Sequence, residues 1–122
     1  MNKTYFLLLL GVLCFTYCKN EQANAAEQIV GQWSLQEATR DGEPTSLLSE
    51  LYFHFTSDGQ METNLPVAPG KATYLLEGKK IMQKGENGAV EYTIQSISDS
   101  VLILAIELKD TPFRFLLKRN NQ

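Results

Sequence analysis

The sequence is poor in the residues that form disulfides and metal sites. Both cysteines, Cys14 and Cys18, lie near the amino terminus, and the 122 residues include a single histidine, His54. Small secreted domains often depend on disulfides, but no cysteine follows position 18. A metal site needs three or four Cys, His or carboxylate ligands close together, and here the acidic residues are spread among predicted turns. We therefore expect no metal and a fold that is stabilised by its core alone.

The sequence also has little excess of charge of either sign. Its 11 basic and 14 acidic residues are interspersed and give a formal net charge of −3. A nucleic-acid-binding surface needs clustered lysine and arginine, which the chain lacks. No glycine-rich phosphate loop follows a predicted strand, and no base and nucleophile set accompanies His54, which we expect to lie exposed on a strand. We predict a protein that is not an enzyme, carries no cofactor and binds no nucleic acid.

Long hydrophobic runs are absent except at the amino terminus. There Lys3 precedes an apolar stretch from Tyr5 to about Tyr17. This stretch is short for a membrane-spanning helix, which needs roughly 20 apolar residues, and it is typical of an export signal. We predict a signal peptide in residues 1–17, a polar tether in residues 18–28 and one folded domain in residues 29–122.

The sequence is compatible with two ends of this signal. One is cleavage after Ala23-Asn24-Ala25, a small-x-small site, which would give a soluble periplasmic protein. The other resembles a bacterial lipoprotein signal, in which a cysteine ends the apolar run and becomes the lipidated first residue. Cys18 stands at that place and implies a membrane-anchored protein of the cell envelope, on its periplasmic or surface face. Tyr17 departs from the small residue of that pattern, Cys14 fits it less well, and both cysteines could also be ordinary members of the apolar run.

Beyond residue 28 apolar and polar residues alternate, as they do in half-buried strands. The clearest segment, 89–97, places Val90, Tyr92 and Ile94 on one face, whereas segment 100–108 is apolar on both faces and should be covered on both. Segment 44–51 is the exception, because Pro44 is suited to start a short helix. The eight predicted strands are 33–39, 50–57, 60–64, 72–78, 80–84, 89–97, 100–108 and 112–119.

The connections between these strands alternate between tight and long. Short turns are predicted at 57–60, around Gly78 and at 98–100, whereas 40–50, 65–71, 85–88 and 109–112 are longer or rich in glycine and proline. Alternate connections of a meander lie at opposite ends, so one end should be closed by tight turns and the other ringed by loops. Eight strands in an open sheet would leave exposed edges and a bare face. We therefore predict an all-β fold, an eight-stranded antiparallel up-and-down barrel.

Gly31-Gln32-Trp33 resembles the G-x-W signature that opens the first strand in the lipocalin family. In that family a helical turn crosses the closed end of the barrel, the tryptophan plugs its base, and a basic residue near the end of the last strand covers the indole. Arg119 stands at the matching place. From Ile29 to Arg119, the segments "HFTSDGQ", "YLLEGKKI", "YTIQSISDSVLIL" and "FRFLLKR" further resemble the short lipocalin-like domains of bacterial envelope lipoproteins, although the barrel is far shorter than that of a full lipocalin.

The resemblance implies non-catalytic binding of a small hydrophobic or amphipathic molecule. The inward side chains would then line a pocket, although in so short a barrel they could instead simply fill the interior, and the lid could simply seal the core. The alternative function is a solid-core interaction module that docks a protein partner through its loop rim. The predicted ligand-binding residues are Phe53, Phe55, Tyr74, Tyr92, Leu104 and Phe115, with Leu47 and Leu48 as the lid.

Overall fold

The computed structural model describes residues 25–120. A helical turn at residues 25–28 precedes nine strands. The predicted export signal and the predicted lipidation residue Cys18 lie outside the described residues. The strands are β1 (Gly31–Arg40), β2 (Glu43–Thr45), β3 (Tyr52–Phe55), β4 (Gln60–Thr63), β5 (Gly70–Glu77), β6 (Lys80–Gly85), β7 (Gly88–Ile97), β8 (Val101–Leu108) and β9 (Thr111–Arg119).

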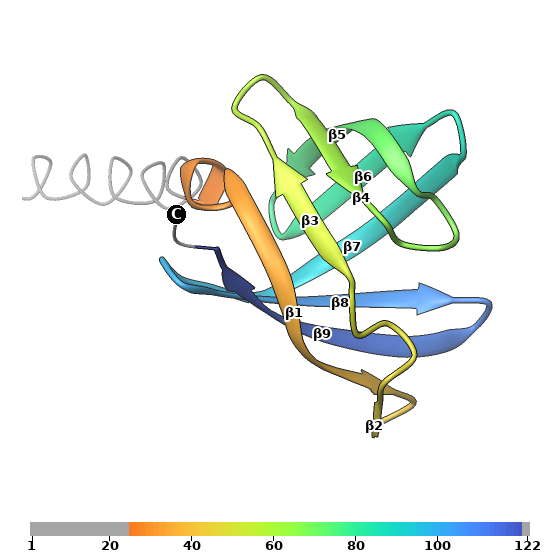
Figure 1. Cartoon of the computed structure of the whole chain (residues 1–122). Helices are drawn as coiled ribbons and strands as arrows, with labels where there is room; N and C mark the ends of the chain where they lie inside the picture. Colours follow the sequence, from red (N-terminus) through yellow and green to blue (C-terminus); the bar gives the residue numbers. More distant parts are fainter. Residues whose placement is uncertain (1–24, 121–122) are drawn as a thin grey trace, which may run out of the picture.

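Strands β1 and β3–β9 form a closed antiparallel barrel (Figure 1). Neighbouring strands pair in chain order, and the barrel closes where β1 pairs with β3 on one side and with β9 on the other. The β1–β9 pairing runs from Trp33–Arg119 to Arg40–Phe113. The predicted eight-stranded antiparallel barrel is therefore confirmed, with β2 as one extra strand.

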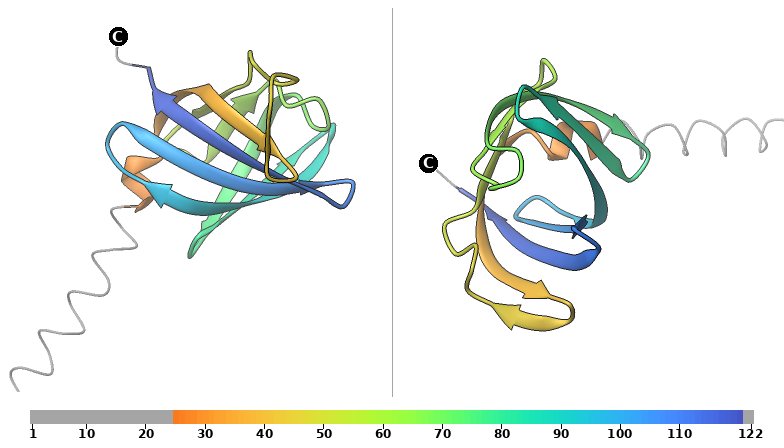
Figure 2. Two further views of the ribbon diagram at one scale, coloured as in Figure 1. Left: turned by 90° about the horizontal axis from the view of Figure 1, so that it is seen from below. Right: turned by 90° about the vertical axis from the view of Figure 1, so that its right-hand side faces the viewer.

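The helix predicted to start at Pro44 is wrong. Glu43–Thr45 instead form β2, which pairs with the end of β1, and residues 47–50 form a turn. The reason lies in the preceding turn, where Asp41 and Gly42 have φ values of 54° and 83°. This left-handed pair makes a tight hairpin that returns the chain along β1, so a strand ladder takes up the backbone hydrogen bonds. The β1–β2 hairpin projects from the barrel (Figure 2).

Aromatic side chains fill the barrel interior. Phe53 and Tyr92 pack edge to face with ring centroids 5.4 Å apart, and Phe55 packs in the same way on Tyr74 at 5.1 Å. The alternation of β3, β5 and β7 places these side chains inward, as the sequence predicts. The core cluster includes Trp33, Phe53, Phe55, Ile81, Tyr92, Leu102, Leu104, Phe115 and Leu117, all with no exposed surface.

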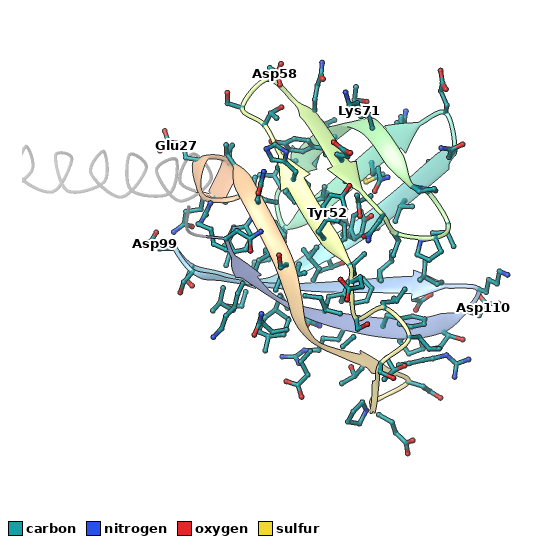
Figure 3. All side chains as sticks on the ribbon, in the orientation of Figure 1. Glu27, Tyr52, Asp58, Lys71, Asp99 and Asp110 are labelled. Atoms are coloured by element: carbon teal, nitrogen blue, oxygen red, sulfur yellow. The ribbon has the colours of Figure 1, made fainter. Side chains whose placement is uncertain are left out.

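The two ends of the barrel differ less than expected. The end with the helical turn, which we call the base, has tight turns after β3, β5 and β7; Figure 3 places Glu27 and Asp99 there and Asp110 at the opposite end, the mouth. The connections at 46–51 and 64–69 of the mouth are long. However, 86–87 and 109–110 are two-residue turns, so the prediction of longer or more open loops is wrong for these two. At 109–110 the reason is that both residues adopt positive φ, which suits a two-residue hairpin.

Lys109, in the turn at 109–110, has a φ of 52°, which lies in the left-handed region. Asparagine adopts the left-handed region more readily than lysine does. We expect Lys109→Asn to raise the free energy of unfolding by about 0.5–1 kcal/mol, measured by urea denaturation. The matched control is Lys71→Asn, at an exposed position of β5, which should bring no gain. A less stable Lys109→Asn variant would contradict the expectation.

Candidate functional site

Trp33 and Arg119 are in contact at the base of the barrel. The Cζ atom of Arg119 lies 4.3 Å from the centroid of the indole ring, and Trp33 Nε1 donates a hydrogen bond to Ile29 O at 2.9 Å. Arg119 Nη1 donates to Val30 O at 2.6 Å, and its Nε donates to Asp99 O at 2.7 Å. The guanidinium thus joins the end of β9 to the segment before β1 and to the β7–β8 turn. These contacts close the base over the indole, which is fully buried.

Gly31 allows this contact to form. Its φ is 137°, a conformation that residues with a side chain rarely adopt, and a Cβ placed on it would collide with Arg119 Nη1. The glycine two residues before Trp33 therefore makes room for the guanidinium. Residues 25–28, which the sequence analysis assigns to the polar tether, also belong to the folded part, because Gln28 O accepts a hydrogen bond from Arg119 Nη2.

The predicted ligand-binding residues lie in the filled core. Tyr74 is half-buried, whereas the other five have no exposed surface, and none of the six lines a surface cleft described below. The two tyrosine hydroxyls have protein partners. Tyr74 Oη donates to Thr56 O at 2.7 Å, and Tyr92 Oη donates to Gln83 Oε1. Neither hydroxyl therefore requires a ligand as its partner.

Tyr92 and Gln83 form a buried polar chain inside the barrel. Gln83 receives the tyrosine hydrogen bond and donates from Nε2 to Ala68 O at 3.0 Å. Burial raises the pKa of Tyr92 above its ordinary value, so its hydroxyl stays protonated and remains a donor. Within residues 25–120 every buried side-chain nitrogen and oxygen has a hydrogen-bond partner. These two hydrogen bonds connect the inner face of β6 and β7 to the 64–69 loop at the mouth.

The predicted lid residues occupy a different part of the mouth. Leu47 is 76% exposed, whereas Leu48 is half-buried and packs on the core. Both line a small hollow of about 190 Å³ together with Leu51 and Pro66. They do not line the larger cleft described next.

The barrel wall opens where β7 and β8 separate toward the mouth. The two strands pair from Ile97–Leu102 to Thr93–Ala105, and the pairing ends there. Gly88–Tyr92 of β7 pair only with β6, and Ile106–Leu108 of β8 pair only with β9. In Figure 1 the two strands meet at the 98–100 turn and diverge toward the mouth.

A cleft of about 660 Å³ occupies this opening. Val90, Ile106, Leu108 and Phe113 line it and also pack against the core, so its floor is apolar. This volume lies in the range of small-molecule sites, about 300–1,000 Å³. The remaining lining residues are Val67, Ala89, Glu91, Thr93, Ala105, Glu107, Lys109 and Pro112.

The sequence pattern does not predict this cleft. The one signal was the predicted strand 100–108, which is apolar on both faces: Ile106 points into the core, and its neighbour Ala105 is half-buried on the other face and lines the cleft. The sequence shows which way each side chain points. It does not show where the pairing of two strands ends, and that point creates the cleft.

Two features are absent from the described part of the chain, a cluster of metal-ligating side chains and a helix able to span a membrane. Within residues 25–120 no group of three or more His, Cys, Asp or Glu side chains could hold a metal ion. Over the same residues no helix is long and apolar enough to cross a membrane. His54 is half-buried rather than exposed, because it lies on β3 between Gln32 of β1 and Glu62 of β4.

The fold is similar to that of a lipocalin-like protein from Bacteroides uniformis. The two structures superimpose with a TM-score of 0.56 over 76% of this chain and 99% of that chain, at 16% sequence identity. At this identity the likeness shows the fold alone, so the chain has a lipocalin-like fold. No protein-family model and no curated protein sequence matches the chain.

Proposed function

We propose that this protein is an exported, non-catalytic binding protein that takes up a small hydrophobic or amphipathic molecule in the cleft between β7 and β8. A lipid on Cys18 would anchor it in the cell envelope. The apolar floor formed by Val90, Ile106 and Phe113 is the observation that carries the proposal. Burying apolar ligand surface against this floor would contribute about 25 cal/mol per Å².

The 64–69 loop, which carries Val67 at the edge of the cleft, is held in place. Gln83 Nε2 donates to Ala68 O at 3.0 Å, and Asn87 Nδ2 donates to Pro69 O at 2.9 Å. A loop fixed by buried and cross-loop hydrogen bonds loses little entropy when a ligand binds. The cleft is therefore a preformed site, and the 64–69 loop takes the position next to the ligand that we had predicted for Leu47 and Leu48.

A second candidate function is docking of a protein partner through the mouth. The filled core and the 76% exposure of Leu47 favour it. The docking function and the small-molecule function predict different results with a small apolar probe. A docking module would have no saturable site for such a probe in the cleft. The titration described next therefore separates the two functions.

Val67→Asp should remove the binding of a small apolar molecule. Val67 is 42% exposed at the edge of the cleft, so an aspartate fits there but places a charge beside the ligand. We expect N-phenyl-1-naphthylamine, a neutral fluorescent probe, to bind the parent protein with saturation and to bind Val67→Asp at least about tenfold more weakly.

The matched control is Leu75→Asp, because Leu75 is 60% exposed on β5 and lies outside the cleft. It should leave the probe affinity unchanged. Equal losses in both variants, or no saturable binding by the parent protein, would contradict the proposed function. Native mass spectrometry of protein purified from its own host would detect the natural ligand, and its intact mass would show whether Cys18 carries acyl chains.

A further inference from the structure

We propose that the ligand of the cleft is a short extended peptide that pairs, as an additional strand, with the free edge of β7. The inference rests on the proposed function of the cleft and names the chemical class of its ligand. It follows from the direction of the backbone groups, the side chains on the two faces of the opening and the length of the unpaired strand.

One hydrogen bond shows which way the N–H and C=O groups of β7 point. Ile94 N–H donates to Lys79 O at 2.6 Å, so the backbone groups of Ile94 point to the β6 side. Backbone groups alternate in direction along a strand. Those of Thr93, Glu91 and Ala89 therefore point away from β6, toward β8.

Only Thr93 of these three finds a strand opposite, because it pairs with Ala105. Ala89 and Glu91 face the cleft instead. Outside the strand pairings, no backbone hydrogen bond within residues 25–120 involves either of them. Their N–H and C=O groups thus form a free strand edge inside the wall of a closed barrel. Such edges bind extended peptides through main-chain hydrogen bonds.

The edge of β8 that faces the cleft is shorter than that of β7. On β8 the residues without a partner on β7 are Ile106–Leu108, whereas on β7 the residues without a partner on β8 are Gly88–Tyr92. We therefore assign the peptide to β7. Five unpaired residues at about 3.3 Å each span roughly 17 Å, which suits a segment of five or six residues.

The side chains around the opening specify the peptide further. Val90 and Ile106 point inward with the core, so a paired peptide would place apolar residues at alternate positions toward them. On the outer rim, Glu91 forms an ion pair with Lys80, with 3.2 Å between Glu91 Oε2 and Lys80 Nζ. Glu107 forms no ion pair with any described residue. A basic residue on the outward face of the peptide would supply that partner, while Lys109 at the mouth favours a second acid or no charge beside it. The fitting sequence has apolar residues at alternate positions and a basic residue opposite Glu107.

The experiment uses a fluorescein-labelled peptide, Val-Lys-Val-Lys-Val-Lys, and fluorescence anisotropy with the purified protein. We expect saturable binding and displacement of N-phenyl-1-naphthylamine from the cleft. Two further peptides have the same sequence but carry N-methyl groups on alternate backbone amides. One is methylated at the odd-numbered amides and the other at the even-numbered amides. In one of these two peptides the methyl groups replace the N–H donors that face β7. That peptide should bind at least about fivefold more weakly than the other.

Ala89→Pro tests the same edge from the protein side. Ala89 is the second residue of β7, and its N–H makes no internal hydrogen bond, so proline removes a cleft donor without removing a strand pairing. We expect it to weaken peptide binding about fivefold, whereas Leu75→Asp, which lies outside the cleft, should leave peptide binding unchanged. Glu107→Gln should weaken the peptide about two- to threefold, against no change in Glu37→Gln, an exposed strand glutamate outside the cleft.

Each outcome decides one of the two proposals. Probe binding without peptide binding, or equal affinity for both methylated peptides, overturns the peptide assignment and leaves the small-molecule function in place. Failure of the parent protein to bind either molecule overturns the proposed function and the peptide assignment together. Peptide binding that Ala89→Pro weakens and Leu75→Asp leaves unchanged supports both.

Discussion

Replacement of Trp33 by alanine should lower the free energy of unfolding by about 3–5 kcal/mol. The side chain is fully buried at the base, and its loss leaves a cavity beneath the aromatic core. It also removes the surface on which the Arg119 guanidinium lies, 4.3 Å from the ring centroid. Urea denaturation followed by circular dichroism measures the change. A loss below about 1 kcal/mol would mean that the base does not hold the barrel closed.

Two substitutions of Arg119 separate its charge from its geometry. Arg119→Ala removes the cation–π contact and the donors to Val30 O and Asp99 O, whereas Arg119→Lys keeps the charge but not the planar set of donors. Stability should therefore fall in the order parent, Arg119→Lys, Arg119→Ala. In Trp33→Ala the same arginine substitutions should cost less, because the two side chains act on each other. Additive losses would contradict the pairing.

Alkaline pH should destabilise the protein through Tyr92. Burial raises the pKa of this phenol in the folded state, while in the unfolded chain it titrates near pH 10. Above pH 10 the unfolded state loses its proton and the folded state keeps it, so the folded state binds more protons. The slope should approach about 1.4 kcal/mol per pH unit, and the free energy of unfolding should fall by roughly 2 kcal/mol between pH 10 and pH 12.

Tyr92→Phe is the control for this titration. It removes the ionisable group, so the part of the alkaline slope that belongs to Tyr92 should disappear. At neutral pH the variant should be less stable by about 1–3 kcal/mol, because Gln83 Oε1 loses its buried donor. Urea denaturation at a series of pH values measures both effects. An unchanged slope in Tyr92→Phe would assign the alkaline loss to other groups.

The structure separates stability from binding along the barrel. The Trp33–Arg119 contact closes the base, whereas the cleft opens at the mouth, between strands whose pairing ends at Thr93–Ala105. Substitutions at the base should therefore change the unfolding free energy and leave the probe affinity of the folded protein unchanged. Val67→Asp should do the reverse, because the Val67 side chain is 42% exposed and lies at the edge of the cleft.

The sequence predicted well whatever depends on neighbouring residues within one strand. The alternation in 89–97 placed Tyr92 and Ile94 inward, and both are buried. The eight strands of the barrel agree with those expected to within a few residues at their ends, and the barrel follows because closure removes free edges. The prediction failed at 44–51, where Asp41 and Gly42 form a hairpin turn and β1 offers a free edge.

By itself, then, the sequence determined the strands and the direction of their side chains. These properties are local, because the direction of a side chain depends on its position along its own strand. Only the tertiary structure decided where β7 parts from β8, and with it the place of the candidate site. That point depends on how the paired strands twist against one another and on the irregular pairing around Gln95, which no alternation pattern records.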